Sequence, residues 1–377
     1  MKIGILSLIL HTNYGGILQS YALQTILERM GHTVIVLDKD RETHRSAIRQ
    51  CLTLGKYILS RYLLKKNIEY YNPRKLNRER KERELNTRAF INKYIHIRAV
   101  RSIQSGVLKD VDAIVVGSDQ VWRPKYFEAQ WKTGIEQAFL KFASSYQIKR
   151  IAYAPSFGTE VWEYSEEQTI ICSRLLQIFD AVSVRETSAL YLCRDKLRRN
   201  DVIHTLDPTL LLSKEDYEHL IDSADIQKSP GNLLCYILDN SKEKQELVER
   251  IAKERHLIPF HTNSKIGNPD APQKDRIQPP VEQWIRGFMD ASFVVTDSFH
   301  ACVFSIIFEK PFVVIANEDR GTARYMSLFS ILSLENHLLN SANQYDGSLS
   351  YAVNEKTINR LKNLKGTSMA FLREALM

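Results

Sequence analysis

The hydrophobic residues of the chain fall into short continuous runs that alternate with segments of helical periodicity. Nine apolar runs, bounded by polar or small residues, predict buried strands. They lie at 2–8, 33–37, 112–116, 149–154, 181–184, 233–238, 258–261, 293–296 and 312–316. Helical spacing of apolar residues occurs at 17–30, 165–179, 242–256, 281–289, 301–308 and 354–376. This alternation predicts an α/β fold with parallel sheets.

Two domains are expected, because the chain has 377 residues and the strand–helix pattern occurs in both halves. We place an N-terminal Rossmann-like domain at 1–210 and a C-terminal Rossmann-like domain with terminal helices at 211–377. A linker and hinge is expected at about 211–231, where the first predicted strand of the second half has not yet begun. A basic helical insertion is expected at 41–101 in the first domain.

The most informative stretch is Thr296–His300, a polar turn between a predicted strand and a predicted helix. Open α/β sheets bind ligands at the carboxyl ends of their strands, where this turn would lie. His300 would stand in the first helical turn, beside backbone N–H groups that favour an anion. Its imidazole could also exchange a proton near neutral pH. The residues alone therefore leave three roles open for His300: anion ligand, general acid or buried core histidine.

Three other polar segments are candidates for a ligand site. Asn13–Gly16 indicates a glycine-rich turn that can approach a ligand closely. Gly117–Trp122 directly follows a predicted strand and indicates a loop at the sheet's carboxyl edge. Arg185 ends another strand, where it either pairs with Glu186 or binds a phosphate or carboxylate.

Composition is typical of a globular protein, with 44% hydrophobic and 25% charged residues, but the charge is unevenly placed. Residues 41–101 contain 17 Lys and Arg against 5 Asp and Glu, so the rest of the chain is negative overall despite a net charge of +8. We therefore expect no nucleic-acid partner, since a recognised motif is also missing. The basic segment is either a solvated helical excursion or a surface for an anionic acceptor or membrane headgroups.

Five scattered cysteines without a CxxC pair favour a reducing compartment over a disulfide framework, and no metal site is expected. We find no signal-peptide pattern and no apolar run near the roughly 20 residues of a membrane-spanning helix. A cytoplasmic protein is therefore expected, with the basic segment as a candidate contact to the inner membrane face.

Five short motifs, taken in order, carry a family resemblance. They are Asn13-Tyr14-Gly15-Gly16, Gly117-Ser118-Asp119-Gln120-Val121-Trp122, Ser183-Val184-Arg185-Glu186, Asp207-Pro208-Thr209 and Thr296-Asp297-Ser298-Phe299-His300. With these motifs the chain resembles the polysaccharide pyruvyl transferase family over about residues 1–324. The resemblance implies a GT-B-like arrangement of two Rossmann-like domains with the active site in the cleft between them. It also implies transfer of pyruvate from phosphoenolpyruvate to a sugar hydroxyl pair, giving a ketal and free phosphate, without a cofactor. The acceptor would belong to a surface polysaccharide, such as a capsule or exopolysaccharide, or to its lipid-linked precursor.

The resemblance also implies roles for individual residues. Arg185 and His300 map to positions around the donor, and His300 becomes the candidate general acid that protonates C3 of phosphoenolpyruvate. Asp119 and Asp297 are candidate bases for the attacking hydroxyl. We assign Ser298, Arg324, Asn13, Gly15 and Gly16 to the donor side of the site, and Ser118, Gln120 and Trp122 to the acceptor side.

Two other functions fit the same architecture. A GT-B glycosyltransferase could use His300, Arg185 and Arg324 to bind the diphosphate of a nucleotide sugar. A non-catalytic relative could keep the fold and bind only a sugar. The presence of both Arg185 and His300 favours an enzyme.

Overall fold

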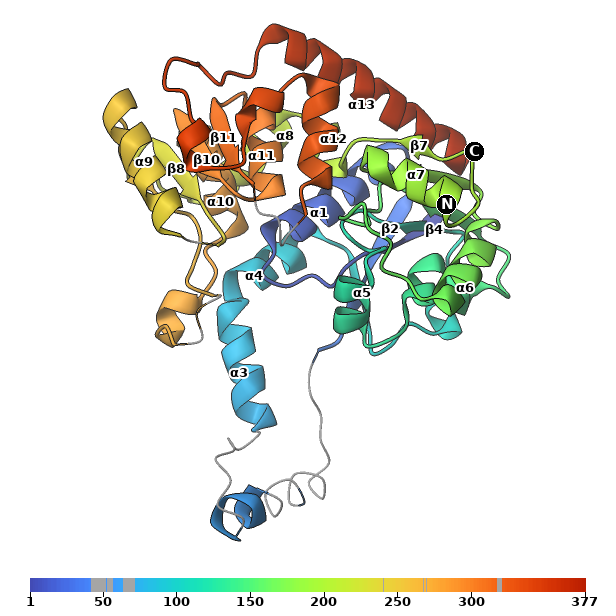
Figure 1. The fold of residues 1–377 in the computed structure, drawn as a ribbon. Helices are drawn as coiled ribbons and strands as arrows, with labels where there is room; N and C mark the ends of the chain where they lie inside the picture. Colours follow the sequence, from blue (N-terminus) through green and yellow to red (C-terminus); the bar gives the residue numbers. More distant parts are fainter. Residues whose placement is uncertain are drawn as a thin grey trace.

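The computed structural model of the protein describes residues 1–41, 52, 57–63, 72–239, 241–266, 268, 270–316 and 321–377. Their strands form a seven-stranded and a five-stranded sheet, one in each half of the chain (Figure 1). All strand pairs in both sheets are parallel. The predicted α/β class with two Rossmann-like halves is therefore confirmed.

The first sheet has the strand order β3-β2-β1-β4-β5-β6-β7. Its strands are β1 (Lys2–Leu6), β2 (Thr33–Lys39), β3 (Ile97–Val100), β4 (Ala113–Val116), β5 (Lys149–Ala152), β6 (Ala181–Val184) and β7 (Ile203–His204). The order reverses between β1 and β4, and such a switch point opens a ligand crevice at the strands' carboxyl ends. The segments that follow β1 and β4 are Asn13–Gly16 and Gly117–Trp122, so two of the predicted ligand loops meet there.

The second sheet has the order β12-β11-β10-β8-β9. Its strands are β8 (Leu233–Tyr236), β9 (Pro259–Phe260), β10 (Phe293–Thr296), β11 (Phe312–Ile315) and β12 (Leu338–Leu339). Here the order reverses between β8 and β10, and β10 leads directly into Asp297–His300. The central strands of both sheets are fully buried, as expected for sheets covered on both faces.

Helices cover the sheets, most of them within a few residues of the predicted positions. In the first half they are α1 (Tyr14–Arg29), α3 (Pro73–Arg83), α4 (Leu85–Tyr94), α5 (Pro124–Trp131), α6 (Glu166–Leu176) and α7 (Thr187–Asp195). In the second half they are α8 (Lys214–Asp222), α9 (Lys242–Arg255), α10 (Val281–Asp290), α11 (Phe299–Ile307), α12 (Ala323–Leu332) and α13 (Glu355–Leu376). Two 3-10 helices, η5 (Pro208–Leu211) and η6 (Gln273–Arg276), lie close to functional segments.

The prediction of a turn at Asn13–Gly16 was wrong in one respect, because α1 begins at Tyr14 and includes both glycines. Tertiary packing overrides the poor helix propensity of glycine at this point. Tyr14 anchors the helix start across the domain boundary, since its ring stacks on Trp284 at 5.3 Å and its hydroxyl donates to the carbonyl of Pro279 at 2.8 Å.

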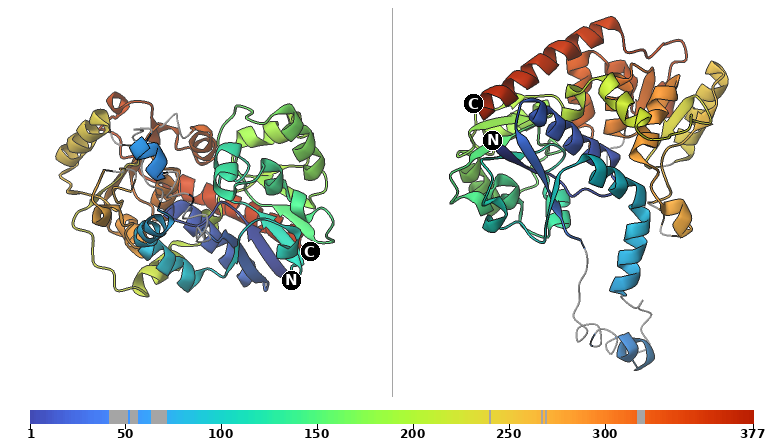
Figure 2. Two further views of the ribbon diagram at one scale, coloured as in Figure 1. Left: turned by 90° about the horizontal axis from the view of Figure 1, so that it is seen from below. Right: turned by 180° about the vertical axis from the view of Figure 1, so that it is seen from behind.

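The basic segment is only partly an insertion. Residues 97–100 form the edge strand β3, and α4 packs on the first domain through buried Phe90 and Ile91. Helix α3 projects from the body of the molecule in both Figure 1 and Figure 2. The end of α3 is nevertheless held by the second domain, because the N–H of Gln278 donates to the carbonyl of Arg83 at 3.1 Å. The helical part of the prediction that falls on 42–51, 53–56 and 64–71 lies outside the described residues.

The two domains share one hydrophobic core. A single cluster of buried side chains joins residues of the first sheet, such as Ile3 and Val115, to residues of the second, such as Leu234 and Val294. The expected hinge at 211–231 contains α8, whose Leu220 and Ile221 belong to this cluster. The segment is therefore mostly packed structure rather than an open linker.

The last helix returns from the second domain to the first. Figure 1 shows α13 running across the molecule toward α7 and β7. The hydroxyl of Ser368 accepts a hydrogen bond from the backbone of Leu206 at 3.0 Å, and Phe371 packs on Tyr153 with ring centroids 6.2 Å apart. Residues 211–377 thus include a helix that braces both halves.

One buried histidine of the second domain makes the fold sensitive to acid. His337 is 2% exposed, and burial lowers its pKa to about 4, although its Nδ1 contacts the carbonyl of Phe312 at 2.9 Å. The unfolded chain, with a histidine pKa near 6.5, binds the proton first. Stability is therefore expected to fall as the pH drops from about 6.5 toward 4, by about 3 kcal/mol from this residue.

We predict that His337→Gln, which keeps an N–H donor for Phe312, flattens this decline. Urea unfolding between pH 7 and pH 4.5 would measure it. The exposed His219→Gln serves as the matched control. Equal slopes for wild type and His337→Gln would contradict the assignment.

Candidate active site

A cavity of about 270 Å³ lies between the two domains, where the two switch points face each other. The first domain lines it with Leu8, His11, Asn13, Asp119, Gln120, Tyr126 and Gln130. The second domain lines it with Leu238, Asp297, Ser298, Phe299, His300, Arg324 and Tyr325. The structure therefore gathers most of the predicted site residues around one interdomain cavity.

His300 occupies the first turn of α11, as predicted from the strand–turn–helix pattern. The turn before it is fixed by Thr296, whose hydroxyl donates to the carbonyl of Tyr236 at 2.7 Å and accepts from the N–H of Ser298 at 3.0 Å. Ser298 is the N-cap of α11, and its side chain makes no capping bond. The hydroxyl of Ser298 and the imidazole of His300 are therefore both placed at the cavity wall.

The imidazole of His300 lies directly against Gly15. A Cβ atom at Gly15 would stand 2.0 Å from Nδ1 of His300, closer than any real contact allows. At Gly16 a Cβ would be 3.4 Å from its nearest neighbour, Asn13, and 3.5 Å from Asp119. Gly15 is thus required by the histidine, which explains a glycine in the first turn of α1.

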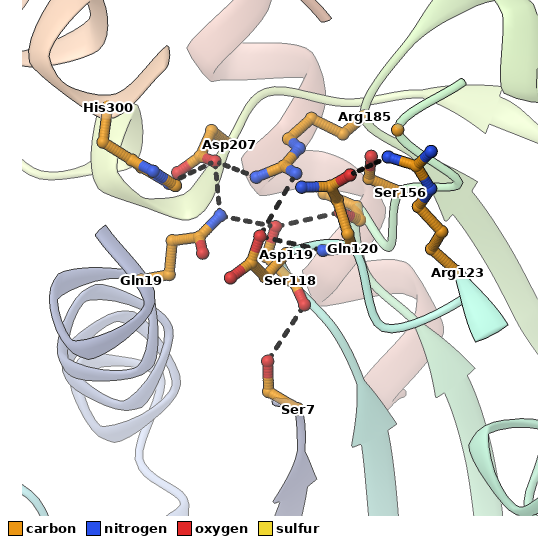
Figure 3. A network of polar contacts seen from close by, with 12 residues as sticks. Ser7, Gln19, Ser118, Asp119, Gln120, Arg123, Ser156, Arg185, Asp207 and His300 are labelled. Atoms are coloured by element: carbon orange, nitrogen blue, oxygen red, sulfur yellow. Dashed lines mark hydrogen bonds and ion pairs between the residues drawn. The ribbon is translucent and has the colours of Figure 1, made fainter. Parts of the chain in front are cut away.

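Asp207 is the centre of the polar network behind the cavity (Figure 3). Its Oδ2 accepts from Nε2 of Gln19 at 2.6 Å and from Nη1 of Arg185 at 2.7 Å, and Nε2 of His300 lies 3.6 Å away. Its Oδ1 accepts from the backbone and hydroxyl of Thr209, at 3.1 and 2.7 Å. One buried carboxylate thus joins residues of α1, β6 and η5 to the histidine of the second domain.

The charge state of Asp207 follows from these contacts. Burial alone would raise its pKa, but the contact with His300 and the charge of Arg185 outweigh burial and hold the pKa well below its usual range. The group is therefore a carboxylate at neutral pH, and it offers a negative partner to both cations.

Arg185 pairs with Asp207 and Asp119, and not with Glu186. Its Nη2 lies 3.6 Å from Oδ1 of Asp119, whereas Glu186 accepts from the hydroxyl of Ser156 and the N–H groups of Phe157 and Gly158. The alternative of an Arg185–Glu186 ion pair is therefore excluded. Burial opposes the charge of Arg185, but Asp207 and Asp119 more than offset it and raise its pKa.

Arg185 retains unused hydrogen-bonding capacity. Its Nε and Nη2 are buried and have no hydrogen-bond partner among the described residues, and the same holds for Nε2 of His300. Buried donors without partners are rare in native proteins and require an explanation, such as a ligand. Arg185 does not line the cavity itself, however. It stands behind Phe299 and Asp119, which do.

Phe299 carries a guanidinium on either neighbouring residue. The guanidinium carbons of Arg185 and Arg324 each lie 5.1 Å from the centre of its ring. Burial and the nearby charge of Arg185 lower the pKa of Arg324. Two buried cations in mutual repulsion favour an anion at this end of the cavity.

The Gly117–Trp122 loop divides between wall, support and core. Asp119 and Gln120 line the cavity. Ser118 lies beneath it, where its hydroxyl donates to the carbonyl of Ala154 at 2.9 Å. Trp122 is fully buried and stacks on Phe139 at 4.8 Å, so no face of its ring is open to an acceptor.

The two candidate bases differ sharply in their surroundings. Asp297 is fully buried, and its carboxylate accepts from the N–H groups of Leu238 and Asp239, at 2.7 and 3.1 Å, and from Nζ of Lys244 at 2.6 Å. It therefore holds the loop after β8 in place. Asp119 accepts a hydrogen bond from the N–H of Gln120 on Oδ1 alone, and none is formed to Oδ2 within the described chain.

Two residues of the network, Asp207 and Gln19, were not predicted as site residues. Asp207 follows β7 directly, as the other site segments follow their strands, and this position could have identified it. Gln19 lies one turn inside α1, where no pattern in the sequence distinguishes it from a surface glutamine. Within the described ranges, no group of three or more His, Cys, Asp or Glu side chains is arranged to hold a metal.

The fold and the cavity define a two-domain α/β protein with a cationic, histidine-containing interdomain site. The chain belongs to the polysaccharide pyruvyl transferase family, whose model matches residues 13–319. No curated protein matches the sequence. None of the helices in the described part of the chain has the length and apolar character needed to cross a membrane.

Three solved structures illustrate the similarity in fold. UDP-N-acetylglucosamine 2-epimerase from Rickettsia bellii is 12% identical, with a TM-score of 0.48 over 99% of this chain and 96% of that one. UDP-GlcNAc 2-epimerase from Neisseria meningitidis bound to UDP-GlcNAc is 14% identical, with a TM-score of 0.47 over 100% and 94% of the two chains. UGT89C1 from Arabidopsis thaliana is 8% identical, with a TM-score of 0.47 over 99% and 93%.

The network makes a prediction about stability. Asp207→Asn removes the charge that compensates buried Arg185, and breaking a buried pair in this way costs about 3 to 5 kcal/mol. Urea unfolding at pH 7 is expected to show this loss. Asp110→Asn is the matched control, because Asp110 pairs with Lys2 and Arg98 on the surface and should change stability little. Similar effects of the two variants would show that Asp207 is not a central structural charge.

Proposed function

We propose that the protein transfers the pyruvyl group of phosphoenolpyruvate to two hydroxyls of a sugar, forming a cyclic ketal and releasing phosphate. The acceptor is a sugar of a surface polysaccharide or of its lipid-linked precursor. Membership of the pyruvyl transferase family supports the reaction type. The observation that carries the proposal is the set of buried, unpartnered N–H groups of Arg185 and His300 beside a cavity that Arg324 also lines.

The donor matches the charge and size of the cavity. Phosphoenolpyruvate carries a phosphate and a carboxylate, the two groups that arginine binds bidentately. A cavity of about 270 Å³ lies just below the usual range for ligand pockets, about 300 to 1,000 Å³, which suits a small donor better than a nucleotide sugar. In this proposal Arg324 binds the donor from the cavity wall, and Arg185 reaches it from behind Phe299 through its free N–H groups.

The first step is protonation of the donor. His300 donates a proton to C3, which becomes a methyl group, and positive charge develops at C2. A sugar hydroxyl then attacks C2 and gives its proton to a base. A general acid in this role contributes on the order of 100- to 10,000-fold to the rate. Asp207 holds the imidazole and stabilises its protonated form, as a buried carboxylate does for a catalytic histidine.

The second step closes the ketal. The C2–O bond to phosphate breaks, phosphate leaves with the bonding electrons, and the second hydroxyl attacks C2. One of the two protons released by the hydroxyls replaces the proton spent at C3, and the other leaves on phosphate, so the reaction is balanced. Asp119 is the better base, because Oδ2 is not engaged, whereas Asp297 would have to give up three donors first.

The proposed reaction predicts a defined product. Purified protein with phosphoenolpyruvate and a galactose- or mannose-type acceptor should release phosphate, and the sugar should gain roughly 70 mass units for pyruvate less water, as in a covalent group transfer. Mass spectrometry and a phosphate assay measure both. Turnover of a nucleotide sugar without any such mass gain would instead support a glycosyltransferase.

The contact between His300 and Gly15 predicts a pair of variants with different activities. Gly15→Ala should displace the imidazole and reduce kcat about as strongly as His300→Ala, by on the order of 100-fold or more, with a much smaller change in donor affinity. Gly16→Ala is the matched control, because its new methyl group meets only ordinary contacts. Equal kcat values for the two glycine variants would refute the proposed role of the His300 position. Loss of donor binding alone in His300→Ala would make the histidine only an anion ligand.

A further inference from the structure

A second, larger cavity lies next to the catalytic one in the C-terminal domain. Its volume is about 940 Å³, and Leu238 lines both cavities. Its walls come from the loop after β8, from α9 and from the segment that follows β9, so it opens at the carboxyl edge of the second sheet (Figure 1). This edge is where open α/β sheets place ligands. We call this second cavity the β8–α9 groove.

Two side chains of the groove are held rigidly by the end of β8. The β8–β9 ladder stops after Leu234 pairs with Phe260. At the same offset of 26 residues, Nδ1 of His261 bonds the carbonyl of Cys235 at 2.9 Å, and Nδ2 of Asn263 donates to the carbonyl of Ile237 at 3.0 Å. Side chains thus replace the backbone ladder, and they fix an imidazole and an amide at the groove wall.

This anchoring also decides which atoms remain for a ligand. A carbonyl only accepts, so Nδ1 of His261 carries the proton and Nε2 of the neutral ring is an acceptor. The Asn263 amide donates through Nδ2, which leaves Oδ1 as an acceptor. Neither Nε2 nor Oδ1 has a hydrogen-bond partner in the part of the chain that the structure describes. Two fixed acceptors therefore face a ligand that brings hydroxyl donors.

The rest of the lining favours a hydroxyl-rich neutral ligand over a phosphate. Gln245 and Glu249 lie one turn apart on α9 and add amide and carboxylate groups. The lining contains no arginine, and its one lysine, Lys265, pairs with Asp275 at 3.2 Å. A diphosphate would find no free cation there, whereas sugar hydroxyls can both donate and accept at these groups.

The size of the catalytic cavity leaves the groove a function. About 270 Å³ holds a small donor and the reacting edge of one sugar, so the remainder of a saccharide chain must lie outside it. The shared wall at Leu238 makes the groove the adjoining space. Asp297 bonds the N–H groups of Leu238 and Asp239, so this wall is fixed three residues from His300.

We propose that the β8–α9 groove binds the neutral sugar residues that adjoin the reacting sugar of the acceptor chain. The reading of these sugars as part of an acceptor rests on the proposed function, but the binding of a neutral oligosaccharide does not. The groove thereby gives the enzyme its preference for a chain over a single sugar, and Glu249, Gln245 and His261 are its specificity-determining residues.

The kinetic test compares short and long acceptors. The probes are methyl β-galactoside and methyl α-mannoside, against neutral tetrasaccharides that end in the same sugars. Wild type should show a KM for the better tetrasaccharide at least about ten-fold below that for its monosaccharide, as expected for two or more added hydrogen bonds. The double variant Gln245→Ala/Glu249→Ala should abolish this difference, with kcat and the KM for phosphoenolpyruvate unchanged.

The matched control is Glu246→Ala, which changes an exposed residue of the same helix that does not line the groove. It should keep the wild-type preference. An equal KM for short and long acceptors in wild type, or an unchanged preference in the double variant, would overturn the proposal. His261→Ala provides a second variant from the opposite wall and should act in the same direction.

A binding measurement separates this proposal from the proposed function. Saturation-transfer NMR without phosphoenolpyruvate should detect one of the tetrasaccharides on wild type, and the double variant should lose that signal. Binding without any pyruvyl transfer would refute the reaction and keep the groove. Transfer to the monosaccharide without binding or preference for either tetrasaccharide would refute the groove and keep the reaction.

Discussion

The site depends on the pairing of one buried carboxylate. Asp207 takes hydrogen bonds from Gln19 and Arg185 and stands 3.6 Å from His300, so three segments distant in the sequence meet at one oxygen. A buried charge is tolerated only when it is paired and hydrogen-bonded, so the network constrains all of its members together. Removing any one cation would leave Asp207 uncompensated. Arg185 and His300 are therefore held at fixed positions before a substrate binds, which is the condition for efficient proton transfer.

The second constraint is the core that the two domains share. Tyr14, at the start of α1, stacks on Trp284 of α10, and Gly15 beside it receives the ring of His300. The histidine of one domain is thus positioned by a helix of the other. Helix α13 adds a brace, because it begins in the second domain and ends against the first. A cleft between independently packed halves would not fix the imidazole in this way.

The sequence predicted what depends on local patterns. Apolar runs located most strands, and polar residues that follow strands had to gather at the carboxyl edges of parallel sheets, which is why Asp119, Gln120, Ser298 and His300 line one cavity. What depends on the packing of distant segments was not predictable. Trp122 belongs to the core because Phe139 stacks on it, and Asp297 is engaged by a loop that follows another strand. Gln19 gained its role only because α1 lies beside η5.

The most direct measurement is the position of phosphoenolpyruvate in a crystal structure of the complex. The account predicts the donor in the interdomain cavity, with its methylene carbon about 3 to 3.5 Å from the imidazole of His300, the distance of a reactive arrangement. Its phosphate or carboxylate should contact Arg324 and the N–H groups of Arg185 that lack a partner. A donor bound elsewhere, or one whose methylene group points away from His300, would contradict the account.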